Sequence, residues 1–387
     1  MGPLSGLKVI ELASIGPGPY CAMLLADLGA EIVRVERAAA RPNDPPPHDS
    51  LLRNRRSIAL NFKNPQAVEL VLRLVEKADV LIEGYRPGVT ERLGLGPEVC
   101  LARNPRLVYG RITGWGQDGP LAKVAGHDIN YISLTGALHL IGLPGGKPVP
   151  PINLVGDMGG GGLLLAFGVL AAVLESRQSG RGQVVDAAMV DGAISMMGVF
   201  FAARAAHSDA LWRDETGNNT LTGAAPWYDT YLTKDGRYIA VGAIEPQFYE
   251  LLLTKLGLDP RRWRALGFPA QDEATRAAWP ELRTALATAF ASRTREEWCR
   301  IFEGSDACVS PVLSMDEAVR HPHNVARKAY VTVGGLVQNA PAPRYSRTPP
   351  APVRPPRPAG ADTEEVLREL GYSAADLAQL RSGGALG

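Results

Sequence analysis

The sequence contains little cysteine, and the few cysteines are scattered. Its 387 residues include four cysteines, at positions 21, 100, 299 and 308, and no two of them form a C-x-x-C pair. This spacing excludes a disulfide framework and a cysteine-rich zinc site of the usual kind. We therefore expect a protein of a reducing compartment, the cytoplasm, with no resident metal.

Net charge and long apolar runs are also scarce. Lysine and arginine total 41 against 40 aspartate and glutamate residues, so no overall field attracts nucleic acid or an anionic membrane surface. The longest apolar stretch, residues 163–174, contains Gly168 and is too short to span a bilayer. The N-terminus lacks the basic-then-apolar pattern of a signal peptide. We expect a soluble protein with neither nucleic acid nor membrane as a partner.

What the sequence does contain is an alternation of strand-like and helix-like segments. Short β-rich runs occur at 7–12, 31–35, 57–60, 80–82, 107–112 and 183–186, with helical patterns or glycine–proline turns between them. Such alternation is typical of an α/β fold with a doubly wound parallel sheet. We also predict a long helix over 163–177 and a second one running through Met197 to Ala206.

The second half of the chain changes character. Strand-like runs at 227–232 and 238–241 flank Lys234-Asp235-Gly236, which is a hairpin signal, and helix-like segments follow. The chain is predicted to have five parts: a large Rossmann-like domain over 1–206, a linker over 207–224, a small α+β domain over 225–318, a second linker over 319–340, and a C-terminal strap and helix over 341–387.

Two segments carry residues that can move protons. Residues 126–131 read Gly-His-Asp-Ile-Asn-Tyr and offer the imidazole of His127; further on, the carboxylate of Asp157 precedes the glycine run 159–162 at what reads as a helix start. One imidazole and one carboxylate suffice to remove a proton from one face of a carbon and to return it on the other. A helix N-terminus supplies N–H groups for the negative charge that appears in between.

Each of these features has a structural alternative. Asp157 serves equally well as a helix N-cap, and a catalytic carboxylate at this place is either a base or a nucleophile. His127 fits a hydrogen-bonded structural histidine, and Glu245, before a proline at a predicted helix start, fits a favourable charge at the helix dipole. Four successive glycines cost helix stability, so they indicate that a ligand or another backbone approaches closely.

The first glycine loop matches a dinucleotide-binding fingerprint only in part. Gly16 and Gly18 follow a predicted strand, and the next strand ends in the acidic Glu36. Cys21 stands where the third glycine belongs, and two prolines remove N–H donors from the loop. The pattern favours the architecture of such enzymes without bound NAD.

Basic residues gather near the predicted ends of strands, where open parallel sheets bind their ligands. Guanidinium groups grip phosphates bidentately, so this placement fits a polyphosphate ligand. A solvated surface explains any single one of them equally well. The residues are Arg34, Arg37, Arg55, Arg56, Lys63, Arg86 and Arg92.

Several segments together resemble the class III CoA-transferase superfamily and, within it, the α-methylacyl-CoA racemases. The superfamily resemblance covers almost the whole chain and is carried by residues 3–12, 28–36, 54–56, 83–88, 113–117, 182–187 and 364–373. The racemase resemblance rests on the 126–131 segment, on Asp157 and on Glu245 within 242–247. Transferases of the superfamily share an aspartate like Asp157, which they use as a nucleophile on the thioester, but generally lack the 126–131 pattern.

The resemblance implies 1,1-proton transfer on a 2-methylacyl-CoA thioester, with the CoA of the substrate and no further cofactor. His127 and Asp157 are then the two acid–base groups, Glu245 orients the imidazole from the other subunit, and amides of residues 159–162 stabilise the enolate. It also implies an interlocked homodimer whose large, CoA-binding domain is made from both chain ends. CoA transfer through Asp157 and plain CoA binding remain the alternatives. The expected substrate contacts are Arg37, Leu60, Asn61, Phe62, Lys63, Gly84, Tyr85, Arg86, Arg92, Gly126, Asp128, Ile129, Asn130 and Tyr131.

Overall fold

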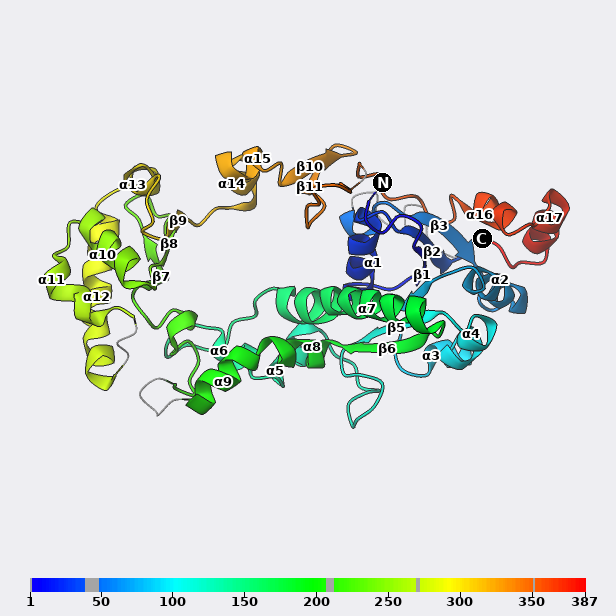
Figure 1. The fold of residues 1–387 in the computed structure, drawn as a ribbon, viewed down its shortest axis with the longest axis horizontal. Helices are drawn as coiled ribbons and strands as arrows, with labels where there is room; N and C mark the ends of the chain where they lie inside the picture. Colours follow the sequence, from blue (N-terminus) through cyan, green and yellow to red (C-terminus); the bar gives the residue numbers. More distant parts are fainter. Residues whose placement is uncertain (1, 39–48, 207–211, 269–271, 351) are drawn as a thin grey trace. The chain divides into compact units, whose positions relative to one another are not determined.

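The computed structural model describes residues 2–38, 49–206, 212–268, 272–350 and 352–387. These residues form two compact units (Figure 1). The first unit joins three segments, Met1–Thr135, Ile152–Met196 and Pro322–Gly387; the second joins Gly136–Pro151 and Met197–His321.

A parallel six-stranded sheet forms the centre of the first unit. Its strand order is β3-β2-β1-β4-β5-β6, so the chain moves outward from β1 in one direction and then continues on the other side of β1. The doubly wound sheet expected from the sequence is therefore confirmed. The place where the strand order reverses lies between β1 and β4, which is where such sheets bind ligands. The strands are β1 (Lys8–Leu12), β2 (Glu31–Arg37), β3 (Arg56–Leu60), β4 (Val80–Glu83), β5 (Val108–Thr113) and β6 (Gln183–Ala188).

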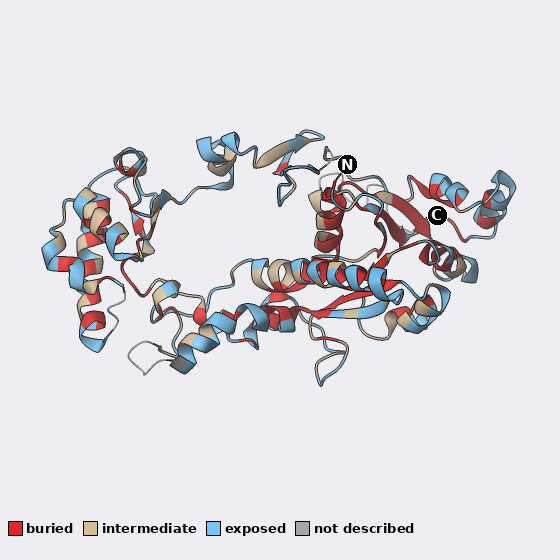
Figure 2. Cartoon of the chain, viewed as in Figure 1, coloured by how far each residue is buried: buried red, intermediate tan, exposed pale blue. Residues whose placement is uncertain are grey.

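Apolar cores cover both faces of this sheet. Successive side chains of a strand point to opposite faces, so Val9 of β1 belongs to one core and Ile10 to the other. Figure 2 shows the strands of the sheet largely buried between helices. The core of Val9 is closed by α1 (Pro17–Asp27) and α7 (Leu164–Ser179). The core of Ile10 is closed by α2 (Pro65–Val75), α4 (Pro97–Arg103), α16 (Thr363–Glu369) and α17 (Ala374–Ser382).

The remaining elements of the first unit are short, apart from one wide helix. The π-helix η2 (Leu154–Leu163) runs directly into α7. The others are η1 (Ser50–Leu52), α3 (Val89–Arg92), α5 (Asp128–Ser133), α8 (Met189–Met196), α15 (Pro322–Ala326) and the hairpin of β10 (Tyr330–Val333) with β11 (Leu336–Asn339).

The second unit is built on an antiparallel sheet around an aromatic core. Strand β8 (Tyr238–Gly242) pairs with β7 (Tyr228–Leu232) and β9 (Val309–Pro311). Trp227, Trp279 and Phe290 are buried in its core. Its helices are α6 (Ala137–Leu140), α9 (Gly198–Ala206), η3 (Thr220–Thr222), α10 (Pro246–Lys255), α11 (Pro260–Trp263), η4 (Arg264–Leu266), α12 (Glu273–Ala291), α13 (Arg295–Phe302) and α14 (Met315–Arg320).

Two helix predictions are wrong in detail. The helix expected through Met197 to Ala206 is broken, since α8 ends at Met196 and α9 begins at Gly198. The helix expected over 163–177 is longer, because η2 extends it back to Leu154. The domain boundaries stay predictions; the expected second linker contains α15 and the β10–β11 hairpin, and residues 207–211 of the first linker lie outside the described residues.

The η2–α7 helix is longer than the apolar run in the sequence, and its length bears on whether it could span a membrane. Over the described residues, one helix, Leu154–Ser179, is long and apolar enough to cross a bilayer: it has 26 residues, and its most apolar 18-residue window has a mean hydropathy of 1.8. The apolar run read from the sequence missed it because the glycines interrupt the run without ending the helix. Core helices pass the same test, and 44% of the most apolar window of this helix is buried.

Candidate active site

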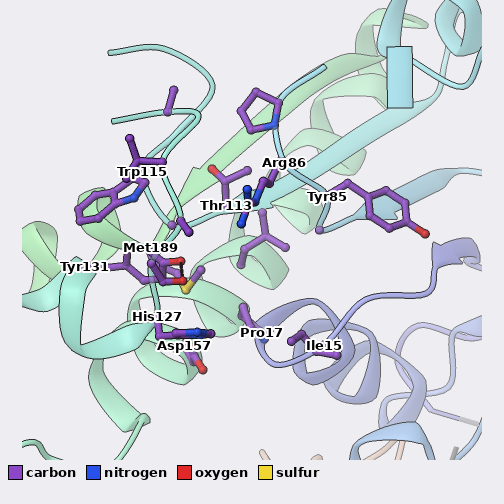
Figure 3. Close-up of a pocket in the computed structure, with 18 residues that line it drawn as sticks. Ile15, Pro17, Tyr85, Arg86, Thr113, Trp115, His127, Tyr131, Asp157 and Met189 are labelled. Atoms are coloured by element: carbon purple, nitrogen blue, oxygen red, sulfur yellow. Dashed lines mark hydrogen bonds between the residues drawn. The ribbon is translucent and has the colours of Figure 1, made fainter. Parts of the chain in front are cut away.

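A cavity of about 260 Å³ opens in the first unit, at the carboxyl ends of the sheet strands where their order reverses. Its walls come from the loop after β1, the loop after β4, the end of β5 and the segment before α5 (Figure 3). His127 and Asp157 both line it and lie beside one another in Figure 3. The structure therefore brings together the two proton-transfer residues that the sequence predicts.

His127 occupies the N-cap position of α5 with an extended backbone. Its N–H donates to Oδ1 of Asn130 at 3.0 Å, which fixes the backbone. The residue is exposed. The imidazole is therefore available to a ligand in the cavity.

Asp157 lies in the first turn of η2, half-buried. Oδ2 of its carboxylate accepts a hydrogen bond from Nδ2 of Asn153 at 3.1 Å. Burial raises the pKa of Asp157 above its ordinary value; the Asn153 hydrogen bond opposes this rise, the charge of Asp128 adds to it and the charge of His127 opposes it. The Asp157 carboxylate is a stronger base than an ordinary aspartate. The N-cap alternative is wrong, because the N-cap of η2 is Asn153.

The glycine run serves the packing of helices against η2. A Cβ on Gly162 would lie 2.6 Å from the carbonyl oxygen of Pro17 in α1, and one on Gly160 would lie 2.7 Å from the backbone nitrogen of Ala193 in α8. The close approach that the sequence indicates is therefore that of other backbones. The expected stabilisation of an enolate by amides of 159–162 is wrong, because these residues lie inside a helix that begins at Leu154.

Three of the arginines predicted to bind phosphate are already paired with carboxylates of the protein. Arg34 and Arg55 are buried and form ion pairs with Glu11, and Arg56 pairs with Glu369 at 2.6 Å. Arg34 and Arg55 are occupied by a buried carboxylate, so the expectation that they grip a phosphate is wrong. For Arg56, whose pair with Glu369 lies at the surface, the expectation stays a prediction. Glu36 is buried and accepts from Arg34 at 3.1 Å, so it does not face a ribose as an NAD site requires.

A second cavity, of about 760 Å³, collects most of the other predicted ligand contacts. It is lined by Arg37, Leu60, Asn61, Phe62, Lys63 and Tyr85, and Tyr85 also lines the first cavity. Gly84, Arg86, Gly126 and Tyr131 lie in the first cavity, whereas Arg92, Asp128, Ile129 and Asn130 line neither. Asp128 is buried, and Ile129 and Asn130 are exposed on α5.

One wall of the second cavity is formed by residues near the C-terminus that the sequence does not predict to bind a ligand. Gly384, Leu386 and Gly387 line it, because the segment after α17 returns to the edge of β3. There the N–H of Asn61 donates to the carbonyl of Ala385 at 2.9 Å. No local signal announces a pairing between residues so distant in the sequence.

Glu245 belongs to the second unit, where it is exposed at the N-cap position of α10. It lies close enough to Cys308 to influence it: burial raises the pKa of that thiol, and the charge of Glu245 raises it further. The predicted role of Glu245 towards His127 stays a prediction. Over the described part of the chain, no three His, Cys, Asp or Glu side chains are grouped as metal ligands would be.

Known proteins resemble the chain over nearly its whole length. The profile of CoA-transferase family III matches residues 4–363. The alpha-methylacyl-CoA racemase of Mus musculus is 46% identical over 381 residues, with 98% of this chain and 96% of the relative covered; that of Homo sapiens is 43% identical with the same coverage. The crystal structure of a CAIB/BAIF family protein from Brucella suis superimposes with a TM-score of 0.78 at 26% identity, covering 95% of this chain and 99% of the other.

Proposed function

The chain belongs to CoA-transferase family III, and from this premise we propose that it interconverts the (2R) and (2S) forms of 2-methylacyl-CoA thioesters. Two relatives that are 46% and 43% identical over 98% of the chain are alpha-methylacyl-CoA racemases. The observation that carries the proposal is the meeting of His127 and Asp157 in one cavity. A carboxylate and an imidazole are the two groups that inversion of a carbon acid requires.

Asp157 takes the α-proton in one direction. The electron pair of the broken C–H bond moves onto the thioester carbonyl and gives a planar enolate. Protonated His127 then donates a proton to the opposite face of the α-carbon, which restores the thioester with inverted configuration. In the reverse direction the two groups exchange roles.

The enolate oxygen needs hydrogen-bond donors, because a thioester α-proton is only weakly acidic. The first N–H groups of a helix have no partner inside it. In α5 these belong to Asp128 and Ile129, which follow His127 directly. We assign them to the enolate oxygen in place of residues 159–162; of this segment His127 lines the cavity, so the assignment places the thioester carbonyl against the backbone that follows it. A donor of this kind is worth about 3 kcal/mol in comparable sites.

The two cavities suit the two ends of an acyl-CoA. The nucleotide and its phosphates occupy the larger cavity, where Arg37 and Lys63 are exposed cations. The pantetheine arm passes Tyr85, which both cavities share, and the thioester reaches the smaller cavity beside Arg86. Arg92, next to Gly88 on α3, stays a further predicted phosphate contact. The reaction needs no cofactor besides the CoA of the substrate.

A homodimer is part of the proposal. Leu163, Phe167 and Leu174 form an apolar stripe on the η2–α7 helix and are 54%, 71% and 62% exposed. Stripes of this kind mark interaction surfaces, and we assign this one to a second copy of the chain rather than to lipid. In the interlocked dimer, Glu245 of the other subunit orients His127. The four free thiols suit the cytoplasm, where the enzyme acts in the metabolism of branched acyl chains.

One experiment tests the function. A single enantiomer of a 2-methylacyl-CoA is incubated with the protein in D₂O, and the optical purity and deuterium content of the thioester are followed. We expect loss of optical purity together with one deuterium at the α-carbon. Unchanged, unlabelled thioester that remains bound would indicate a CoA-binding protein, and a hydroxylamine-sensitive mass increase at Asp157 would indicate a CoA transferase.

A further inference from the structure

Asp128 connects the two segments that carry the acid–base groups. It follows His127 in the chain, and Oδ1 of its carboxylate accepts a hydrogen bond from the backbone N–H of Asp157 at 2.7 Å. The residue that follows one proton-transfer group therefore holds the backbone of the other.

The packing around this contact leaves no room for a side chain on Gly156. A Cβ on Gly156 would lie 2.5 Å from Oδ1 of Asp128 and 3.2 Å from Cγ2 of Ile132. Real Cβ atoms do not approach oxygen so closely. Gly156 is therefore a glycine because Asp128 sits against its backbone.

The same carboxylate is poorly satisfied, which is unusual for a buried charge. Asp128 is only 7% exposed, and its Oδ2 is buried without a hydrogen-bond partner in the described structure. A buried carboxylate oxygen without a partner is costly. A structural role alone does not explain this cost, because an asparagine at the same place also accepts the N–H of Asp157 and carries no charge.

We propose that Asp128 is a positioning residue, which holds the Asp157 backbone in register with His127 and keeps an unneutralised negative charge beside the catalytic carboxylate. The proposal rests on the proposed function, because it assigns a role within that reaction. Through the hydrogen bond, the orientation of α5 fixes where η2 presents Asp157. Through its charge, Asp128 makes Asp157 a better base.

Two cationic side chains face the cavity beside Asp157: Arg86, whose charge lowers the pKa of Tyr131, and His127, whose charge opposes the rise in the pKa of Asp157. Neither forms an ion pair with Asp128 among the described residues, so the charge of Asp128 still acts on Asp157. The side of α5 contributes Asp128, His127 and the Tyr131 phenol, and burial and the charge of Asp157 raise the pKa of Tyr131. On η2 itself the nearest polar group is the neutral Asn153. The α1 helix approaches through Gly16, whose Cβ would lie 3.5 Å from Oδ2 of Asp157. The acidic residue of α8, Asp191, raises the pKa of Asp186 through its charge.

The test compares Asp128→Asn with Asp128→Ala in the full-length protein. Asparagine keeps an acceptor for the Asp157 N–H and removes the charge, so Asp157 ionises more readily. We expect the acid limb of the kcat/KM profile to move to lower pH by roughly one unit, with kcat at the plateau reduced only a few-fold. Alanine also removes the acceptor; we expect kcat to fall about a hundred-fold, as for small misplacements of catalytic groups, with KM nearly unchanged.

Asp186→Asn is the matched control. Asp186 also accepts a backbone N–H, that of Gln117 at 3.1 Å, and burial likewise raises its pKa, but it lines neither cavity. Its replacement is expected to leave the pH profile of racemisation in place. An acid limb that stays fixed in Asp128→Asn, or that moves equally in Asp186→Asn, would overturn the proposal.

A second pair of variants keeps the test informative if Asp128→Ala folds poorly. Gly156→Ala drives a methyl group into Oδ1 of Asp128 and is expected to lower kcat about as much as Asp128→Ala does. In the double variant the clashing carboxylate is gone, so the two losses should not add. Fully additive losses would contradict the shared contact. Failure of the proposed function is distinguishable, because it removes deuterium exchange from the unsubstituted protein as well.

Discussion

Glu11 differs from Asp128 and Asp157 in whether an arginine neutralises its carboxylate. Glu11 on β1 is fully buried between two guanidinium groups: Arg55 is 2.8 Å away and Arg34 also pairs with it. Asp128 and Asp157, at the contact of α5 with η2, form no ion pair with any lysine or arginine that the structure describes.

This difference in pairing separates the structural role of Glu11 from the catalytic role of Asp157. Arg34 donates to the carbonyl of Ser14 at 3.3 Å and Arg55 donates to that of Pro19. The paired cluster thus holds the loop that presents Ile15 and Pro17 to the cavity. Glu11 is neutralised by two guanidinium groups, whereas Asp157 forms no ion pair with a lysine or arginine among the described residues and keeps a raised pKa. Pairing stabilises the wall, and the absence of pairing preserves reactivity.

The largest expected effect comes from removing the unpaired groups. His127→Ala and Asp157→Ala should each reduce racemisation by about a thousand-fold or more, since each removes one of the two proton-transfer groups. CoA affinity should change less than about two-fold, because the nucleotide contacts lie in the other cavity. Chiral separation of the thioester product and calorimetric titration with CoA measure the two quantities. Near-normal turnover in either variant would contradict the role given to that residue.

Breaking the paired cluster should damage stability instead. Glu11→Gln leaves the buried Arg55 without a carboxylate partner and leaves Arg34 with Glu36 alone, which costs about 3–5 kcal/mol. Urea unfolding measures this loss, while turnover per folded molecule should stay within a few-fold of normal. Arg103→Met, which breaks surface pairs with Glu69 and Glu76, is the control and should cost less than about 1 kcal/mol. Equal losses of unfolding free energy in the two variants would contradict the difference expected between a buried and a surface ion pair.

Cations that line the larger cavity also lack a charge partner in the part of the chain that the structure describes. Arg37 and Lys63 form no ion pair within the described residues and line the larger cavity, so a phosphate is their expected partner. Lys63→Ala should raise KM for a 2-methylacyl-CoA roughly ten-fold, the loss of one charge-assisted contact. It should leave the kinetics of the matching 2-methylacyl-pantetheine thioester unchanged, since that substrate lacks the nucleotide. An equal loss with both thioesters would place Lys63 outside the nucleotide site.

The smallest effect concerns pH and stability. The folded state raises the pKa of Asp157, so it binds that proton more tightly than the unfolded chain does. Ionised Asp157 therefore costs stability at pH above its folded pKa, and the cost disappears as the pH falls below its unfolded pKa. Asp157→Asn should raise the melting temperature by about 2 °C at pH 7 and by less at pH 4. Scanning calorimetry at both values checks this; a lower melting temperature at pH 7 would contradict it.

The sequence is enough to predict the sheet, but it does not show which acidic residues are paired with a buried arginine. Continuous β-branched runs predict buried parallel strands, and the sheet has them. The burial of Arg34 depends on strand register, because Arg34 stands directly beside Glu11 on the neighbouring strand. Register is set by tertiary pairing, so Arg34 and the exposed Arg37 read alike in the sequence.

The active site was predictable only in part, because it also depends on contacts between segments that are distant in the sequence. His127 and Asp157 stood out because unusual residues surround each of them, and the structure brings them to one cavity. The glycines after Asp157 misled the prediction of the helix start, since their purpose depends on backbones contributed by α1 and α8. The wall formed by Gly384 and Leu386 had no signal, because a β-bridge to Leu60 creates it.

Solvent exchange in the two single-base variants tests the central claim most directly. Each enantiomer of a 2-methylacyl-CoA is incubated in D₂O with His127→Ala and with Asp157→Ala, and deuterium at the α-carbon is measured without regard to racemisation. If the two groups act from opposite faces, each variant labels one enantiomer only, and the two variants label different ones. Labelling of the same enantiomer by both variants would contradict the account.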